Sequence, residues 1–395
     1  MASQFIPRAV FPTLDSLPRS YFLGHHRSGL TKMKSMLSSI DLLLECRDYR
    51  VPITSTNPLF EATLAGRERV IVYTKKDLGS EEREEDRRVS NLLLRLSNRA
   101  TRLSPAQAHT PSNLACKVTN IHSSIQREEM IRHFHHPSPV LFSSHKDKAS
   151  VRKILTLAKS RAAANPSLTG HRMMIVGMPN VGKSSMLNAL RLVGVGKGKA
   201  AITGGQPGVT RKIGTSVKIV DGSQTENTGR EGAEAVGEST DIYLVDTPGV
   251  FIPFVPDPAS MLKLALCGSV KDTIIPPTTL ADYLLFQLNL HDPLLYAKFS
   301  PPTNDITVLL TAIAQHTGRL GRGGTPDLEG AALWMIQRWR GGSMGRFVLD
   351  DVSKGAWEER RRMAEKLGGS MNSARRADKD ARRERGRIRR AGVAQ

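Results

Sequence analysis

Residues 177–185 read GMPNVGKSS, and residues 246–249 read DTPG. The first stretch has the spacing of a phosphate-binding loop, in which two glycines let the backbone curl around phosphate oxygens, a lysine reaches them and a serine hydroxyl binds Mg²⁺. The apolar run Met173–Val176 precedes the loop, and a helix-forming stretch follows it over residues 185–192. This strand, loop and helix predict a nucleotide site with its phosphates at the helix N-terminus.

Two segments after the loop supply further candidate contacts. Asp246 ends the apolar run Ile242–Val245 and would hold Mg²⁺ through water, while the Gly249 amide would sense a γ-phosphate. Thr210 ends the stretch GQPGVT, and we expect it to coordinate Mg²⁺ in the triphosphate state and release it after hydrolysis. The predicted loop contacts are Asn180, Val181, Gly182, Lys183, Ser184 and Ser185, and the predicted Mg²⁺ ligands are Ser184, Thr210 and Asp246.

The best candidate for a base-reading motif is TKKD at residues 74–77, after an apolar run that begins at Val70. The Asp77 carboxylate can accept hydrogen bonds from the N1–H and 2-amino group of guanine. Adenine lacks this donor pair, so an aspartate here selects GTP over ATP. Lys75 would lie along the base plane, and Thr74 stands where such motifs usually carry asparagine. A solvated turn is the alternative interpretation of TKKD.

A second apolar run could contribute to the same base site. It begins at Val140 and ends in Ser143 and Ser144, whose amides could face the guanine O6. The base-reading motif usually follows the phosphate loop and DTPG, but here it precedes both. Cutting such a chain between its switch region and its base-reading strand, and joining the old ends, produces this order. The sequence therefore predicts an α/β fold, a circularly permuted P-loop GTPase domain with a mostly parallel sheet, followed by a small helical C-terminal domain.

This motif order resembles the YlqF/RbgA class of circularly permuted GTPases, and within it the mitochondrial members. Residues 21–26, YFLGHH, are similar to the W-F-P-G-H-M signature of the class. Residues 40–58, IDLLLECRDYRVPITSTNP, resemble its D-x-x-x-E-x-x-D-A-R-x-P-x-S-x-N-P stretch, and residues 313–327 look like its C-terminal helical module. The chain departs from the class at Leu23, Tyr49 and Thr74. The resemblance implies a GTPase that binds GTP and GDP and acts in assembly of the large ribosomal subunit.

The resemblance also points to a catalytic histidine. Many small GTPases carry a water-orienting glutamine directly after DTPG, but this chain has Val250 there, followed by two more apolar residues. His25 matches the histidine of the G-H signature, and a neutral imidazole can accept a hydrogen bond from water. Structural packing of His25 against the GTPase domain is the alternative. Asn180 resembles the asparagine with which related GTPases bind K⁺ beside the phosphates, which makes K⁺ a second candidate cofactor.

Composition limits the partners of the chain. Its 395 residues carry 57 Lys and Arg against 37 Asp and Glu, a net charge of +20, and the basic excess is heaviest after Trp357. Such a basic segment, poor in aromatic residues, is expected to be disordered alone and to bind RNA phosphates, here ribosomal RNA. A solvated helix or a peripheral contact with the inner mitochondrial membrane is the alternative. No apolar run is long enough for a transmembrane helix, and the three cysteines are not spaced for zinc or for a disulfide framework.

The predicted organisation has four parts. Residues 1–20 would suit a short mitochondrial targeting segment, residues 21–255 form the permuted GTPase domain, residues 256–350 the helical domain, and residues 351–395 a disordered basic tail. The expected location is the mitochondrial matrix, where the protein would support mitochondrial translation. Two other functions stay open. One is an RNA-binding scaffold that nucleotide stabilises and whose hydrolysis is idle, and the other is a ribosome-assembly GTPase of the cytosol or plastid.

Overall fold

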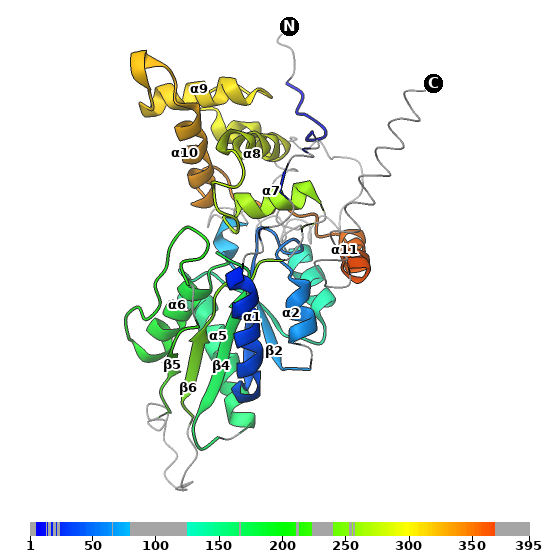
Figure 1. The fold of residues 1–395 in the computed structure, drawn as a ribbon, viewed down its shortest axis with the longest axis vertical. Helices are drawn as coiled ribbons and strands as arrows, with labels where there is room; N and C mark the ends of the chain where they lie inside the picture. Colours follow the sequence, from blue (N-terminus) through cyan, green and yellow to red (C-terminus); the bar gives the residue numbers. More distant parts are fainter. Residues whose placement is uncertain are drawn as a thin grey trace, which may run out of the picture.

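A computed structural model describes residues 5–12, 14, 17–18, 21, 24–64, 66–79, 125–165, 167–210, 213–222, 240–252, 255 and 257–367. Within these ranges a six-stranded sheet with helices on both faces forms one end of the molecule, and a group of helices lies over the other end (Figure 1). The predicted RNA-binding tail from residue 368 onward lies outside the described residues, as do the side chain of His25 and about half of residues 1–20.

The sheet confirms the predicted permuted fold. Its spatial order is β3-β2-β1-β4-β6-β5, with only the β5–β6 pair antiparallel. Three strands that precede the phosphate loop in the chain therefore lie on one side of β4, the strand that leads into the loop, and β1 pairs with β4 directly, as in the register Leu44↔Ile175. The strands are β1 (Leu42–Asp48), β2 (Arg69–Thr74), β3 (Val140–Phe142), β4 (His171–Gly177), β5 (Ser216–Val220) and β6 (Ile242–Asp246).

Alternating apolar side chains bury both faces of the sheet, as parallel sheets require. Leu43 and Met174 face α1 (Gly24–Met36) and α2 (Pro58–Thr63), whereas Leu44 and Ile175 face the opposite core cluster. Helices α5 (Lys148–Ala164) and α6 (Lys183–Val195) cover that second face. Further helical segments are residues 125–135 and the short 3₁₀ turns η1 (Leu37–Ser39) and η2 (Lys76–Leu78). All the carboxyl ends of the parallel strands therefore point to one edge, where the predicted motifs gather.

We call residues 257–349 the helical module. Three of its helices begin at aspartate caps, Asp257, Asp305 and Asp327, whose carboxylates accept hydrogen bonds from free amides of the first turn. The module lies over the carboxyl edge of the sheet (Figure 1). Its elements are α7 (Pro258–Leu266), α8 (Pro277–His291), η4 (Pro293–Tyr296), α9 (Ile306–Thr317), η5 (Arg322–Gly324) and α10 (Leu328–Arg340). The helical C-terminal domain expected from the sequence is thus present.

After the helical module, the chain packs against the GTPase domain again. The composition predicted a disordered tail from residue 351 onward, but part of this segment is helical. Residues Lys354–Leu367 form helix α11. Trp357 is buried and stacks on Phe134, with ring centroids 4.9 Å apart, and Arg360 donates a hydrogen bond to the carbonyl of Thr56. Burial of this large aromatic residue against the GTPase domain contributes to holding an otherwise charged helix in place.

The described part of the N-terminal segment packs against the helical module. Arg8 forms an ion pair with Asp282 of α8, with the two atoms 2.6 Å apart. The Phe11 ring meets the Tyr283 ring edge-on at 5.1 Å. These contacts connect residues before the first helix to the last domain of the fold. Whether residues 1–20 serve in targeting stays a prediction.

Candidate nucleotide-binding site

The phosphate loop connects β4 to α6 and has the backbone that its glycines predict. Gly177 and Gly182 both have positive φ, and so does Asn180 at 55°. An added Cβ on Gly177 would lie 2.3 Å from the carbonyl oxygen of Cys46, so only glycine permits this close packing against β1. Helix α6 starts at Lys183. Its free amides and positive dipole end point toward the space above the loop, which suits an anionic phosphate group.

The Lys183 side chain lies along the loop. Its ammonium group donates hydrogen bonds to the carbonyls of Gly177, at 3.2 Å, and Met178, at 2.7 Å. Burial lowers the pKa of Lys183 to about 8, although the nearby Asp246 carboxylate favours the charged form. A phosphate group would supply the opposite charge that this buried ammonium needs.

Three oxygen-bearing side chains meet beside the loop, as the sequence predicts. The Ser184 Oγ lies 2.7 Å from Asp246 Oδ2 and 3.2 Å from the Thr210 hydroxyl. Burial raises the pKa of Asp246. Among the described residues, Asp246 Oδ1 is buried without a hydrogen-bond partner. An all-oxygen donor set with an unsatisfied carboxylate oxygen fits Mg²⁺, which prefers such ligands and retains water in its shell.

The DTPG turn packs directly on the phosphate loop. A Cβ on Gly249 would lie 2.5 Å from the Cα of Pro179, and the Val250 amide donates to the Gly177 carbonyl at 3.2 Å. Val250, Phe251 and Ile252 are all buried. The position after DTPG therefore contributes core packing and has no side chain that could orient water.

His25 and His26 begin helix α1 near this turn. The His26 ring is buried, and its Nδ1 accepts a hydrogen bond from the Phe251 amide at 3.3 Å. The side chain of His25 lies outside the described residues, so its catalytic role stays a prediction. The ring of His26, which the motif did not single out, contacts the segment after DTPG.

A pocket lies over the phosphate loop, and most of the residues predicted to bind the phosphates and Mg²⁺ line it. Its wall combines the loop, the Gly249 turn and a segment that we call the switch segment, residues 202–210. It is lined by Pro179, Asn180, Gly182, Lys183, Ser184, Ser185, Ile202, Thr203, Gly204, Gln206, Gly208, Val209, Thr210 and Gly249. Val181 is buried beneath the loop, and Asp246 is mostly buried beside Ser184.

The base-reading residues lie next to this pocket, at the ends of β2 and β3. Lys75 adopts a left-handed backbone with φ of 57°, and its ammonium group contacts Asp48 Oδ2 at 3.0 Å and the Asn180 carbonyl at 2.5 Å. Asp77 is partly exposed and lies 3.4 Å from the ammonium group of Lys146. The Asp77 carboxylate is thus accessible, as a guanine contact requires.

The two serines after β3 are arranged less simply than predicted. The Ser144 amide donates to the Ser150 hydroxyl at 3.3 Å, and the Ser143 hydroxyl lies 2.9 Å from the same group. A guanine O6 at the Ser144 amide would therefore compete with Ser150, the hydroxyl in the first turn of α5.

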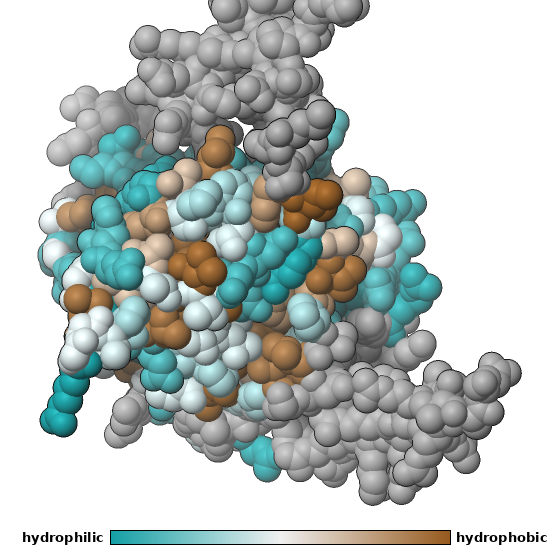
Figure 2. Space-filling model, turned by 90° about the horizontal axis from the view of Figure 1, so that it is seen from above, coloured by the Kyte–Doolittle hydropathy of each residue, from teal (hydrophilic) through white to brown (hydrophobic). Residues whose placement is uncertain are grey.

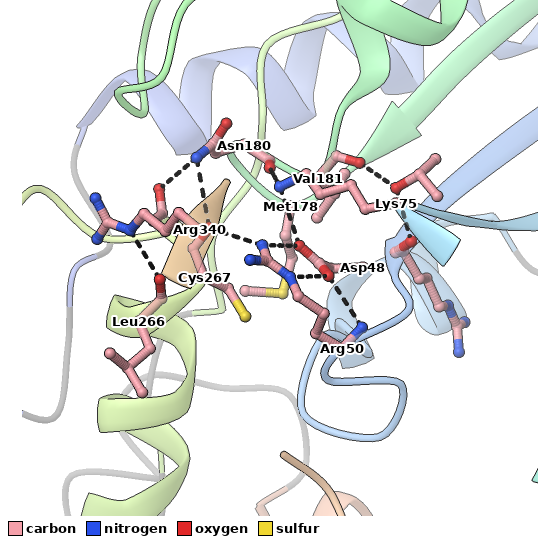
Figure 3. A network of polar contacts seen from close by, with 12 residues as sticks. Asp48, Arg50, Lys75, Met178, Asn180, Val181, Leu266, Cys267 and Arg340 are labelled. Carbon is pink, nitrogen blue, oxygen red and sulfur yellow. Dashed lines mark hydrogen bonds and ion pairs between the residues drawn. The ribbon is translucent and has the colours of Figure 1, made fainter. Parts of the chain in front are cut away.

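Sequence reasoning missed the buried ion pair behind Lys75, which Figure 3 shows. Asp48 and Arg50 are both about 1% exposed and form a two-pronged contact, with Nη2 of Arg50 2.8 Å from Asp48 Oδ2. Burial alone would raise the pKa of Asp48, but Arg50 and Lys75 outweigh it and hold that pKa well below its usual range. Burial also lowers the pKa of Lys75. The signal was available, because both residues lie in the quoted stretch at 40–58.

Comparison with known proteins identifies related chains. A family described as "50S ribosome-binding GTPase" matches residues 172–291. The "Mitochondrial GTPase 1" of Schizosaccharomyces pombe is 34% identical over 354 residues, covering 89% of this chain and 94% of that protein. Its Schizosaccharomyces japonicus namesake is 32% identical over 86% of this chain and 93% of its own length. The Bos taurus "Mitochondrial ribosome-associated GTPase 1" is 28% identical, with 87% and 92% covered.

Proposed function

The chain belongs to the mitochondrial GTPase 1 family, and from that premise we propose that it is a GTP-hydrolysing assembly factor for the large subunit of the mitochondrial ribosome. It is a GTPase. The observation that carries the proposal is the meeting of the Ser184, Thr210 and Asp246 oxygens beside the pocket over the phosphate loop. A scaffold with idle hydrolysis has no need of a threonine on the switch segment. The names of its relatives, mitochondrial GTPase 1 and mitochondrial ribosome-associated GTPase 1, support the mitochondrion and the ribosome as its setting.

In this mechanism the chain binds the phosphates through the loop amides and the Lys183 ammonium group. Ser184, Thr210 and Asp246 hold Mg²⁺, which when bound neutralises charge on the phosphates. His25 accepts a hydrogen bond from the attacking water. Because Val250 and its two neighbours are buried in the core, the segment after DTPG excludes water from that side. The Gly249 amide then faces the γ-phosphate.

Asn180 contributes to a K⁺ site in this proposal. Its amide nitrogen donates to the carbonyls of Gly205 and Gly268, both at 3.1 Å. Those contacts orient the side chain and leave its carbonyl oxygen as the atom that would coordinate K⁺, since oxygen is the ligand such a hard cation takes. Replacing K⁺ by Na⁺ in a turnover assay tests this role, and an unchanged rate removes the cation from the mechanism.

Ribosomal RNA is the partner that the surface of the helical module favours. The Trp334 ring lies under two guanidinium groups, those of Arg319 at 5.6 Å and Arg338 at 5.0 Å. Basic groups beside a part-exposed aromatic ring suit phosphate contact together with base stacking. Seen from above in Figure 2, hydrophilic side chains alternate with isolated apolar ones on this part of the molecule. Among the described residues, no helix is long and apolar enough to cross a membrane.

The test is GTP turnover with and without large ribosomal subunits, using small subunits as the control. We expect large subunits alone to raise the rate, by at least about tenfold. His25→Ala should bind GTP normally but lose most of this stimulation, because a positioned acid–base group contributes roughly 10²–10⁴-fold. Lys183→Ala should lose binding as well. Equal turnover with and without large subunits would overturn the assembly role. If His25→Ala is stimulated as strongly as the wild type, His25 has a structural role instead.

A further inference from the structure

The switch segment is held at three points by polar contacts. The Thr210 hydroxyl lies 3.2 Å from Ser184, and the Gly205 carbonyl accepts a hydrogen bond from Asn180 at 3.1 Å. Both contacts join the segment to the phosphate loop. The third is different, because Gln206 Nε2 donates to Asp272 Oδ2, at 2.7 Å, and Asp272 belongs to the helical module. The segment predicted to change shape with the nucleotide is therefore attached to a second domain.

Asp272 is rigidly held where it receives Gln206. Arg340, the last residue of α10, donates hydrogen bonds to the Asp272 carboxylate from both terminal nitrogens, at 2.6 Å and 3.0 Å. The two side chains are only 14% and 10% exposed. A bidentate pair of this kind fixes direction as well as distance. Although burial alone would raise the pKa of Asp272, the Arg340 contacts lower it, so the carboxylate stays ionised as an acceptor.

Arg340 also fixes the end of α7 beside the phosphate loop. Its Nε and Nη2 donate to the carbonyls of Leu266 and Ala265, at 2.8 Å and 2.7 Å. Two residues after Leu266, Gly268 approaches the loop so closely that a Cβ there would lie 2.6 Å from Asn180 Nδ2. One arginine thus aligns the α7–α8 connection with both the loop and the switch segment.

From this geometry we propose that Asp272, held by Arg340, is a positioning residue for GTP hydrolysis: it fixes Gln206 and thereby places Thr210 for the nucleotide-bound state. Three residues separate Gln206 from Thr210, and one of them, Pro207, has a fixed φ and is buried. Anchoring Gln206 therefore restricts where Thr210 can lie. Residues 202–206 are exposed, and among the described residues the Asp272 contact attaches them to the helical module.

The variants that test this are Gln206→Ala, Asp272→Asn and their combination, in the full-length chain without ribosomal subunits. Gln206 is exposed, so its replacement breaks the contact without disturbing the module. Gln206→Lys serves as the conservative rescue, since a lysine can still donate to the Asp272 carboxylate. The matched control is Asp282→Asn, which breaks an aspartate–arginine pair of the same 2.6 Å separation elsewhere in the helical module.

We expect each single variant to lower kcat by about 10- to 150-fold, the range that one lost charge-assisted hydrogen bond supplies. GDP affinity should be unchanged, because GDP has no γ-phosphate for the switch segment to meet. Amide hydrogen exchange over residues 202–210 should become faster with a bound non-hydrolysable GTP analogue. The double variant should be no slower than the worse single one, and Gln206→Lys should retain most activity.

Several outcomes would overturn the proposal. Wild-type kcat and wild-type exchange in Gln206→Ala would mean that the contact does not position the segment. Additive effects of the two substitutions would mean that they act separately. An equal loss in Asp282→Asn would show that activity responds to any weakening of the module. Because the assay contains no ribosomal subunits, none of these outcomes depends on the assembly role proposed above.

Discussion

The hydroxyl of Thr74 contacts the main-chain carbonyl of Val181, so that the base-reading strand is connected directly to the phosphate loop. The same hydroxyl lies 3.0 Å from the carbonyl of Arg47, on the neighbouring strand. Motifs of this type usually begin with asparagine, and threonine has one polar group fewer. The structure shows that the single hydroxyl still reaches the loop. The ammonium group of Lys75 reinforces the junction through the Asn180 carbonyl.

The first prediction concerns base selection by Asp77. Replacing it with alanine should weaken GTP binding by about 2–4 kcal/mol, since the guanine donors lose a charged acceptor. Asp77→Asn offers a sharper variant, because an amide nitrogen can donate to the 2-carbonyl of xanthine. That variant should prefer XTP to GTP in equilibrium binding, whereas both variants should bind ATP as poorly as the wild type. Unchanged GTP affinity in Asp77→Ala would reassign TKKD to an ordinary turn.

The second prediction concerns pH. Burial lowers the pKa of Lys183 to about 8 in the nucleotide-free protein, and bound phosphates should raise it because they favour the charged form. Below that pKa Lys183 is already protonated, so its titration does not make GDP affinity depend on pH. Above it, binding must take up a proton, and GDP affinity should fall as pH rises.

Calorimetry in buffers of different ionisation enthalpy measures this proton uptake directly. At about pH 8.5 we expect binding to take up close to half a proton or more, and at about pH 7 clearly less from this group. The same low uptake at both pH values would show that Lys183 keeps its charge throughout.

The third prediction concerns Asp350, which joins the two domains. Its nearly buried carboxylate accepts hydrogen bonds from the amides of Ile53 and Thr54, at 2.9 Å and 2.7 Å, and lies 3.1 Å from the Lys263 ammonium group. Asp350→Ala should lower the free energy of unfolding by roughly 2–4 kcal/mol, because two buried amides and a lysine lose their acceptor. Urea unfolding followed by tryptophan fluorescence measures this loss.

Asp351 provides the control for that measurement. It is exposed, and its carboxylate accepts hydrogen bonds from the amide and hydroxyl of Ser353. Asp351→Ala should therefore change stability by less than about 1 kcal/mol. Similar losses in the two variants would mean that Asp350 contributes no more than a local turn.

The fourth prediction concerns the basic segment at the C-terminus. Removing residues 371–395 should flatten the salt dependence of large-subunit binding by about 0.7–0.9 in log–log slope for each lost phosphate contact. The cut lies beyond α11, so basal GTP hydrolysis should be unaffected. If the truncated chain binds with the full slope, the segment does not touch RNA. Sedimentation with anionic vesicles would then test the peripheral membrane alternative.

The sequence predicted local features well, because each is encoded within a few residues. The phosphate loop, the DTPG turn and the switch threonine each carry their own spacing, and the motif order alone indicated the permuted sheet. Contacts between distant segments were not predictable in this way. Trp357 of α11 stacks on Phe134, which lies more than 200 residues earlier in the chain. Asp272 contacts Gln206 only when the helical module is packed on the GTPase domain. The hydrogen bond from the Ser144 amide to the Ser150 hydroxyl was likewise not predictable, because the position of a strand end does not specify the direction of a side chain on the next helix.

The permuted strand order has a consequence for how the chain acquires its fold. β1 lies at the centre of the sheet and all seven of its residues are buried, yet one of its two partners, β4, begins 129 residues later (171 minus 42). A chain that emerges N-terminus first therefore presents a strand that is buried in the native sheet, with one hydrogen-bonding edge open. At ordinary synthesis rates that exposure lasts on the order of ten seconds. Until β4 arrives, such an edge is a site for misassociation with other chains. Early pairing of β1 with β2 covers only one of its two edges, so the other edge stays open until β4 is synthesised.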